Sequence, residues 1–166
     1  MPHYETQYLD LMRRIWHGGD ERVDRTGVGT RSLFGETMRF SLADNAIPLL
    51  TTKRVYWKTA ARELLWFLTG DTNIRPLLQQ GVRIWTDWPL ARYRAETGED
   101  IDAAAFEARI VGDAQFAAKW GDLGPVYGHQ WVNWPRYEPA GDGLFRRAAT
   151  GHNQIAALVT SLRSNP

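Results

Sequence analysis

Apolar positions recur at helical spacing in three parts of the chain. The first part contains Tyr8, Leu11, Met12, Ile15 and Trp16. The second part runs from Tyr56 to Leu68, and the third contains Ile155, Leu158, Val159 and Leu162. Side chains three or four positions apart share one face of a helix, and Gly18-Gly19 and Gly70 end the first two patterns. We therefore predict three amphipathic helices.

A different pattern follows the first helix. Residues 24–30 form a Gly-rich loop, and residues 32–40 then alternate between two faces, which predicts a strand with a bulge at Gly35. Residues 41–54 and residues 135–151 are rich in turn-forming residues and predict irregular structure.

The middle of the chain predicts further short helices. One passes through Leu77 and ends at Gly81, with Asp71, Thr72 or Asn73 as its candidate cap. Residues 90–119 are charged and rich in alanine, with Asp102 and Asp113 as candidate caps. This second stretch predicts a helical excursion from the body of the protein.

Length and charge narrow the class of protein. With 166 residues, a single domain is the natural expectation. The 20 basic and 19 acidic residues are interspersed and give a net charge of +1, whereas a nucleic-acid-binding surface needs clustered Lys and Arg. The sequence has no apolar run of the roughly 18 residues that a membrane span needs. We therefore expect no DNA partner and no membrane insertion.

Cysteine and histidine usage adds two expectations. The sequence contains no cysteine, so it has neither a disulfide framework nor a thiolate metal site. Its four histidines lack metal-ligand spacing, and we expect no metal.

The first residues lack the basic and apolar regions of a secretory signal, and we expect a cytoplasmic location.

Glu63 is the strongest candidate for acid–base chemistry. It lies on the predicted 56–68 helix, and none of the residues three or four positions away is cationic. A carboxylate on an apolar face needs distant hydrogen bonds, water or a ligand, and burial favours its protonated form. A structural carboxylate paired to a distant arginine is an equally good interpretation from the local pattern.

Four further positions allow both a functional and a structural interpretation. Arg25 lies in the Gly-rich loop, where it could grip phosphate or belong to a surface turn. Trp85 and Trp88 could stack on a heterocycle or pack in the core. Tyr127 ends a Gly-Pro loop, where its phenol could contact a ligand or a buried network.

Five blocks, in this order along the chain, resemble the amino-terminal part of thymidylate synthase. They are Asp24–Thr30, Thr51–Arg54, Glu63–Ile74, Ile84–Trp88 and Gly121–Gly128. The similarity runs from Tyr8 to Pro166, and five matched blocks are far more specific than one short motif.

The resemblance implies an α+β fold in which helices cover a mixed β-sheet that is incomplete in this chain. Residues 1–166 would be the amino-terminal portion of a single domain, and residues 90–119 correspond to a region where the family varies in length. The complete family enzyme is a homodimer. It converts dUMP to dTMP, and 5,10-methylenetetrahydrofolate gives both the one-carbon unit and the hydride.

The resemblance also implies roles for individual residues. The glutamate matching Glu63 organises water and proton transfer around the pyrimidine, and the tyrosine matching Tyr127 lies near the reactive cysteine. The arginine matching Arg25 binds the dUMP phosphate. Matches to Ile84, Trp85 and Trp88 line the pocket for folate and the pyrimidine.

The resemblance also places Lys53 and Tyr56 near folate. The lysine matching Lys53 lies near the folate tail. From the local pattern alone, Lys53 would be interpreted as a solvated charged residue. Tyr56 stands where many family members have histidine, and we expect it to contact folate.

The family's nucleophilic cysteine is missing from these residues. The chain also ends before the paired arginines that the family gives to its partner subunit's phosphate site. We therefore expect a truncated portion that is inactive alone. Two alternatives stay open: a pyrimidine nucleotide hydroxymethylase of the same fold, or a non-catalytic nucleotide-binding or dimerisation homologue.

Overall fold

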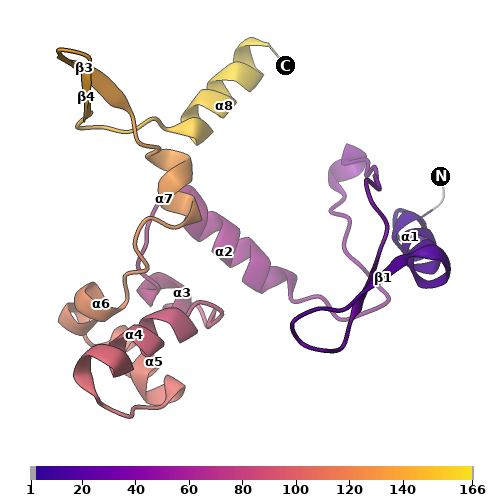
Figure 1. Cartoon of the computed structure of the whole chain (residues 1–166), viewed down its shortest axis with the longest axis horizontal. Helices are drawn as coiled ribbons and strands as arrows, with labels where there is room; N and C mark the ends of the chain where they lie inside the picture. Colours follow the sequence, from indigo (N-terminus) through magenta and orange to yellow (C-terminus); the bar gives the residue numbers. More distant parts are fainter. Residues whose placement is uncertain (1–2, 166) are drawn as a thin grey trace. The chain divides into compact units, whose positions relative to one another are not determined.

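The computed structural model describes residues 3–165, with only the backbone of Asp44, and divides them into two compact units. One unit ends at Trp57 and the other begins at Lys58. The first contains α1 (Glu5–Gly18), β1 (Asp20–Arg22), β2 (Thr30–Ser32) and the 3-10 turn η1 (Ala43–Asn45), which Figure 1 shows. The single domain expected from the sequence stays a prediction.

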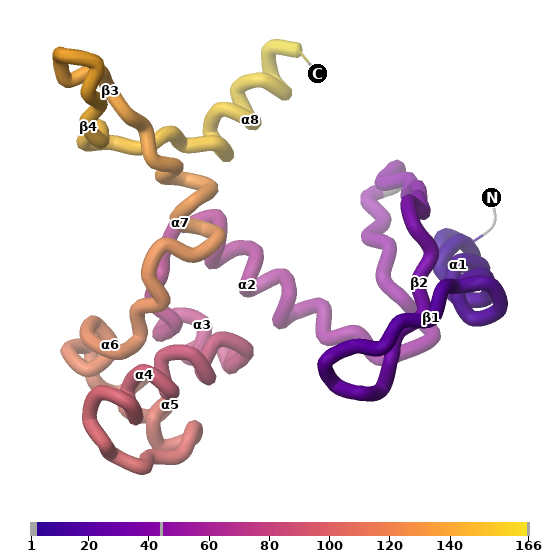
Figure 2. Tube along the Cα trace, viewed as in Figure 1, coloured from indigo at the N-terminus to yellow at the C-terminus, as the bar shows by residue number. Residues whose placement is uncertain are grey.

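The first unit is built around one predicted helix and one hairpin. Helix α1 confirms the spacing from Tyr8 to Trp16. Strand β1 pairs antiparallel with β2, and the Gly-rich loop connects them, as the trace in Figure 2 shows. Gly27 and Gly29 have φ of 75° and 82°, a left-handed conformation that glycine adopts without strain.

The predicted strand over residues 32–40 is wrong beyond Ser32, and so is the bulge at Gly35. The structure assigns no strand to residues 33–40, and Phe34 is fully exposed. Alternating side chains stabilise a strand only where a neighbour completes the hydrogen-bond ladder. Among the described residues, no strand pairs with this segment.

Helix α2 (Trp57–Thr69) confirms the second predicted helix, and α8 (Gln154–Ser164) confirms the third. Between them lie α3 (Arg75–Gln79), α4 (Asp87–Thr97), α5 (Ala103–Gly112), α6 (Ala114–Trp120) and α7 (Tyr127–Val132). The short helix predicted before Gly81 is α3. Helix α7 was not predicted, because the Gly-Pro loop before it dominates the local pattern.

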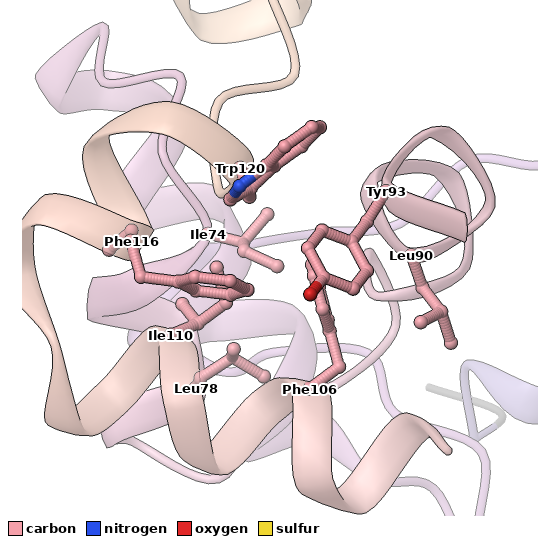
Figure 3. Packing of buried hydrophobic residues seen from close by; sticks show 9 residues of the cluster. Ile74, Leu78, Leu90, Tyr93, Phe106, Ile110, Phe116 and Trp120 are labelled. Carbon is pink, nitrogen blue, oxygen red and sulfur yellow. The ribbon is translucent and has the colours of Figure 1, made fainter. Parts of the chain in front are cut away.

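The predicted excursion over residues 90–119 is helical, as expected. Its helices are α4, α5 and α6, and side-chain oxygens of Asp102 and Asp113 accept backbone hydrogen bonds that cap α5 and α6. These helices surround an aromatic and aliphatic core (Figure 3). It contains Ile74, Leu78, Leu90, Tyr93, Phe106, Ile110, Phe116, Ala117 and Trp120. Ile74 is the N-cap of α3 and Leu78 lies on α3, so the excursion shares this core with α3.

Residues 135–151 are not wholly irregular, which corrects the sequence interpretation. They contain the antiparallel strands β3 (Tyr137–Gly141) and β4 (Leu144–Arg147). The loop signal came from their tight turn, where Asp142 and Gly143 have φ of 50° and 74°. Both strands are short and largely exposed, so no clear alternation marks them.

The α+β class expected from the sequence is confirmed. Within residues 3–165 the strands form two separate two-stranded antiparallel sheets. The sheet of the expected fold is thus incomplete here, as predicted. In the second unit, α2, the start of α4 and the start of α7 bring several predicted site residues together.

Candidate functional site

Glu63 on α2 finds a distant partner, as its sequence context required. Nε1 of Trp85, 22 residues further along, donates a hydrogen bond of 2.7 Å to Oε1 of Glu63. The partner is an indole, not the distant arginine of the alternative interpretation. Glu63 is half-buried.

Trp85 is the centre of an aromatic cluster. Its ring centroid lies 5.3 Å from that of Trp88, 6.1 Å from Phe67 and 6.0 Å from Tyr127. Phe67 also packs edge-to-face on Tyr127 at 5.5 Å. Such separations are favourable for aromatic pairs. The structure therefore brings Glu63, Trp85, Trp88 and Tyr127 into one neighbourhood.

A cavity of about 420 Å³ opens beside this cluster. It is lined by Trp85, Trp88, Leu123, Pro125, Val126, Tyr127 and Gln130. Trp88 is 63% exposed and Tyr127 is 56% exposed, so both rings present surface to a ligand. A cavity of this size, mostly apolar with few polar groups, is typical of a small-molecule site. Ile84 is exposed but does not line the cavity.

The two motif blocks that carry Glu63 and Tyr127 are joined by backbone hydrogen bonds. The amide of Ile74 donates to the carbonyl of Gly121 at 2.9 Å, and the amide of Leu123 donates to the carbonyl of Thr72 at 3.0 Å. The side-chain amide of Asn73 also donates to the carbonyl of Ala117 at 2.7 Å. These bonds fix the end of α6 and the start of the Gly-Pro loop to the segment between α2 and α3.

Gly128 explains how Tyr127 approaches α2 so closely. A Cβ built at Gly128 would lie 2.4 Å from the carbonyl oxygen of Phe67 and 2.7 Å from its Cα. Only glycine fits this position without a backbone shift. The sequence interpretation missed the role of both Gly128 and Phe67. The glycine directly after Tyr127 was the available signal.

Arg25 belongs to the first unit, so its placement is described there alone. The side chain is exposed and, within residues 3–165, makes no hydrogen bond or ion pair. Its loop is nevertheless ordered, because Oδ1 of Asp24 accepts hydrogen bonds from the Thr26 hydroxyl at 2.7 Å and the Thr26 amide at 2.9 Å. These bonds, led by the hydroxyl, lower the pKa of Asp24.

A cavity of about 690 Å³ also lies along this loop, lined by α1 side chains and by residues on both sides of Arg25. Arg25 itself is not among the lining residues. The structure thus leaves its guanidinium free, without assigning it a ligand.

The segment that carries Lys53 is held by a residue that the sequence interpretation missed. Glu5, at the start of α1, is only 4% exposed and accepts four hydrogen bonds from the amides and hydroxyls of Thr51 and Thr52, of 2.5–2.9 Å. These bonds, led by the Thr51 hydroxyl, lower the pKa of Glu5 to about 2. An acidic residue in a first helical turn is so common that nothing marked it.

Lys53 follows this anchored pair and is exposed. Tyr56 is exposed too, and the guanidinium carbon of Arg54 lies 5.2 Å from the centroid of its ring. This is a cation–π distance. Both predicted folate contacts are therefore on the surface of the first unit.

Two kinds of feature are absent from the described residues. No helix in residues 3–165 combines the length and apolar character needed to cross a bilayer. In the same residues, no group of three or more His, Cys, Asp or Glu side chains is arranged to hold a metal ion.

Comparison with known proteins gives consistent matches along the chain. A family model described as Thymidylate synthase matches residues 6–166. A thymidylate synthase of Sphingopyxis alaskensis is 84% identical over 164 residues, which are 99% of this chain and 53% of the relative. A thymidylate synthase of Novosphingobium aromaticivorans is 73% identical, over 99% of this chain and 52% of the relative. One from Rhizorhabdus wittichii is 70% identical, over 99% and 53%. The chain thus spans about half the length of these curated relatives.

Proposed function

This chain belongs to the thymidylate synthase family, and we propose that the whole protein of which it is a part converts dUMP to dTMP. The co-substrate is 5,10-methylenetetrahydrofolate. Its methylene carbon becomes the methyl group, its ring supplies the hydride, and the proton on carbon 5 of the pyrimidine is lost. Dihydrofolate is the second product.

One observation supports this proposal best: Trp85 lines the cavity together with Trp88 and Tyr127, and the same indole donates a hydrogen bond to the carboxylate of Glu63. Flat aromatic rings offer stacking surface to a fused heterocycle. A carboxylate that is hydrogen-bonded to one wall of this cavity is a candidate for proton exchange with a substrate or its water. We assign Glu63 to proton transfer around the pyrimidine, and Trp85, Trp88 and Ile84 to the folate and pyrimidine pocket.

In this proposal, residues of the first unit bind the charged ends of the two ligands. Arg25, which has no partner within residues 3–165, binds the dUMP phosphate through its guanidinium. Lys53 faces the anionic tail of folate, and Tyr56 contacts folate.

Tyr127 lies near the nucleophile. The whole protein is proposed to be a cytoplasmic homodimer.

The nucleophile is proposed to come from outside residues 1–166. A thiolate attack on the pyrimidine needs a cysteine, and none occurs in these residues. Serine and threonine are weak nucleophiles without an adjacent base. Residues 1–166 alone should therefore form no dTMP.

The test uses the full-length protein with dUMP and methylenetetrahydrofolate, and measures dTMP and dihydrofolate together. Equal amounts of the two products support the proposal. A hydroxymethylated nucleotide without dihydrofolate would favour the hydroxymethylase alternative. Nucleotide binding without turnover would favour the non-catalytic alternative. A purified polypeptide of residues 1–166, freed of host enzyme, is the control, and turnover by it would contradict the role of an external cysteine.

A further inference from the structure

Thr86 occupies the N-cap position of α4 but does not cap it. Threonine at this position usually accepts a hydrogen bond from an amide of the first helical turn. Here the side chain makes no capping hydrogen bond. Its hydroxyl instead donates to Oε1 of Glu107 at 2.7 Å. Thr86 is 3% exposed and Glu107 is 7% exposed, so this bond joins two buried groups of different helices.

The second oxygen of Glu107 contacts Arg83, at the other end of the four-residue turn that ends at Thr86. Nε of Arg83 lies 3.2 Å from Oε2 of Glu107. The amide of Thr86 also donates to the carbonyl of Arg83 at 3.2 Å. One carboxylate thus contacts both ends of the four-residue turn that contains Trp85. Trp88 follows in the first turn of α4.

Glu107 is itself held firmly. Its neighbours on α5, Phe106 and Ile110, are completely buried. Both belong to the hydrophobic core drawn in Figure 3. The side chain of Asp102 accepts the capping hydrogen bond of α5 at 2.7 Å. A binding residue is precise only when the residues around it lock its position. Here the core of the excursion supplies that support.

We propose that Glu107 is a positioning residue for the wall formed by Trp85 and Trp88, and therefore for folate. This inference rests on the proposed function. Glu107 does not touch the cavity; it acts through Thr86 and Arg83. The helical excursion thus fixes the orientation of the tryptophan wall through Glu107.

The first test measures KM values in the full-length protein. Glu107→Leu should raise the KM for methylenetetrahydrofolate about tenfold, because a displaced pocket wall weakens binding. Glu107→Gln keeps an acceptor for the Thr86 hydroxyl and should restore most of the folate affinity. Equal folate KM values for Glu107→Leu and wild type would overturn the proposal.

Thr86→Val provides a second route if Glu107→Leu folds poorly. It removes only the hydroxyl and keeps the size of the side chain. It should raise the folate KM in the same way, and adding Glu107→Leu should give less than the sum of both effects. Fully additive effects would mean that the two residues act independently, against the proposal. Glu99→Gln is the matched control, because Glu99 belongs to the same excursion but contacts Tyr93 and Arg109.

A fluorescence measurement, which needs no catalytic turnover, tests this inference separately from the proposed function. Acrylamide should quench the tryptophan fluorescence of Glu107→Leu more strongly than that of the wild type. The difference should disappear when Trp85 and Trp88 are both replaced by Phe. Unchanged quenching would overturn the positioning role even in an active enzyme. Increased quenching in a protein that makes no dTMP would support the positioning role and contradict the proposed function.

Discussion

Oε1 of Glu63 accepts a hydrogen bond from Nε1 of Trp85, so the acid–base candidate also fixes one wall of the aromatic cavity. Within residues 3–165, the other oxygen, Oε2, makes no hydrogen bond. One oxygen is therefore structural, and the other is available for proton exchange. This division suggests a substitution that separates the two roles.

Glu63→Gln should abolish proton exchange while keeping the wall in place. The amide oxygen of glutamine can still accept the Trp85 hydrogen bond, but the amide cannot act as acid or base. We expect kcat of the full-length protein to fall about 10²-fold or more. Thermal unfolding should be little changed. Glu96→Gln, an exposed carboxylate of α4, is the control. Near-native kcat for Glu63→Gln would refute the assignment.

Arg25→Ala should weaken nucleotide binding through its phosphate alone. A hydrogen bond to a charged group contributes about 1.5–3 kcal/mol, and we expect a loss of this size for dUMP. Deoxyuridine, which has no phosphate, should bind the variant and the wild type almost equally. Isothermal titration of both ligands checks this, with Arg13→Ala on α1 as control. If both ligands lose affinity equally, Arg25 is a structural residue of its loop.

Gly128→Ala should destabilise the protein. The added Cβ would lie 2.4 Å from the carbonyl oxygen of Phe67, so α7 and α2 must separate. Forced overpacking costs about 1–3 kcal/mol. Urea unfolding of the full-length protein measures the change. Gly112→Ala is the matched control, since a Cβ there meets nothing within 4 Å. A variant at position 128 as stable as this control would disprove the close approach.

Glu5 should make stability depend on pH in the acid range. Its pKa is lowered from 4.5 to about 2 in the folded protein, so its stabilising contribution is complete above pH 4.5. That contribution is lost as the pH falls from 4.5 toward 2, because the unfolded chain then binds the proton more readily. Chemical unfolding at a series of pH values should show a smaller acid loss for Glu5→Gln than for wild type. Parallel curves would show that Glu5 does not contribute.

The sequence predicted the elements whose signal is local. Helices α1, α2 and α8 have clear apolar spacing, and the caps Asp102 and Asp113 were identified because capping depends on adjacent residues. The strand expected over residues 32–40 failed, because a strand needs a neighbour that the described residues do not provide. Local pattern does not contain that information.

The candidate site shows the same limit. Glu63 could be predicted to need a distant partner, but its bond to Trp85 joins residues 22 positions apart. The sequence analysis did not single out Glu107 among the charged residues of 90–119, and only the fold shows that it is buried against Thr86. Sequence pattern and family resemblance identified the residue types. Packing of distant segments determined which of them meet.

The pairing of Thr72–Ile74 with Gly121–Leu123 also bears on how this chain tolerates changes in length. The amide of Ile74 and the carbonyl of Gly121 lie 2.9 Å apart, so the intervening segment leaves and re-enters the unit at one place. A segment with adjoining ends can be exchanged for a longer or shorter one with little strain elsewhere, and each doubling of a flexible loop adds only about 0.6 kcal/mol. Chimeras that exchange the whole of residues 75–120 are therefore feasible, provided that the graft brings its own counterparts of Trp85, Thr86 and Glu107.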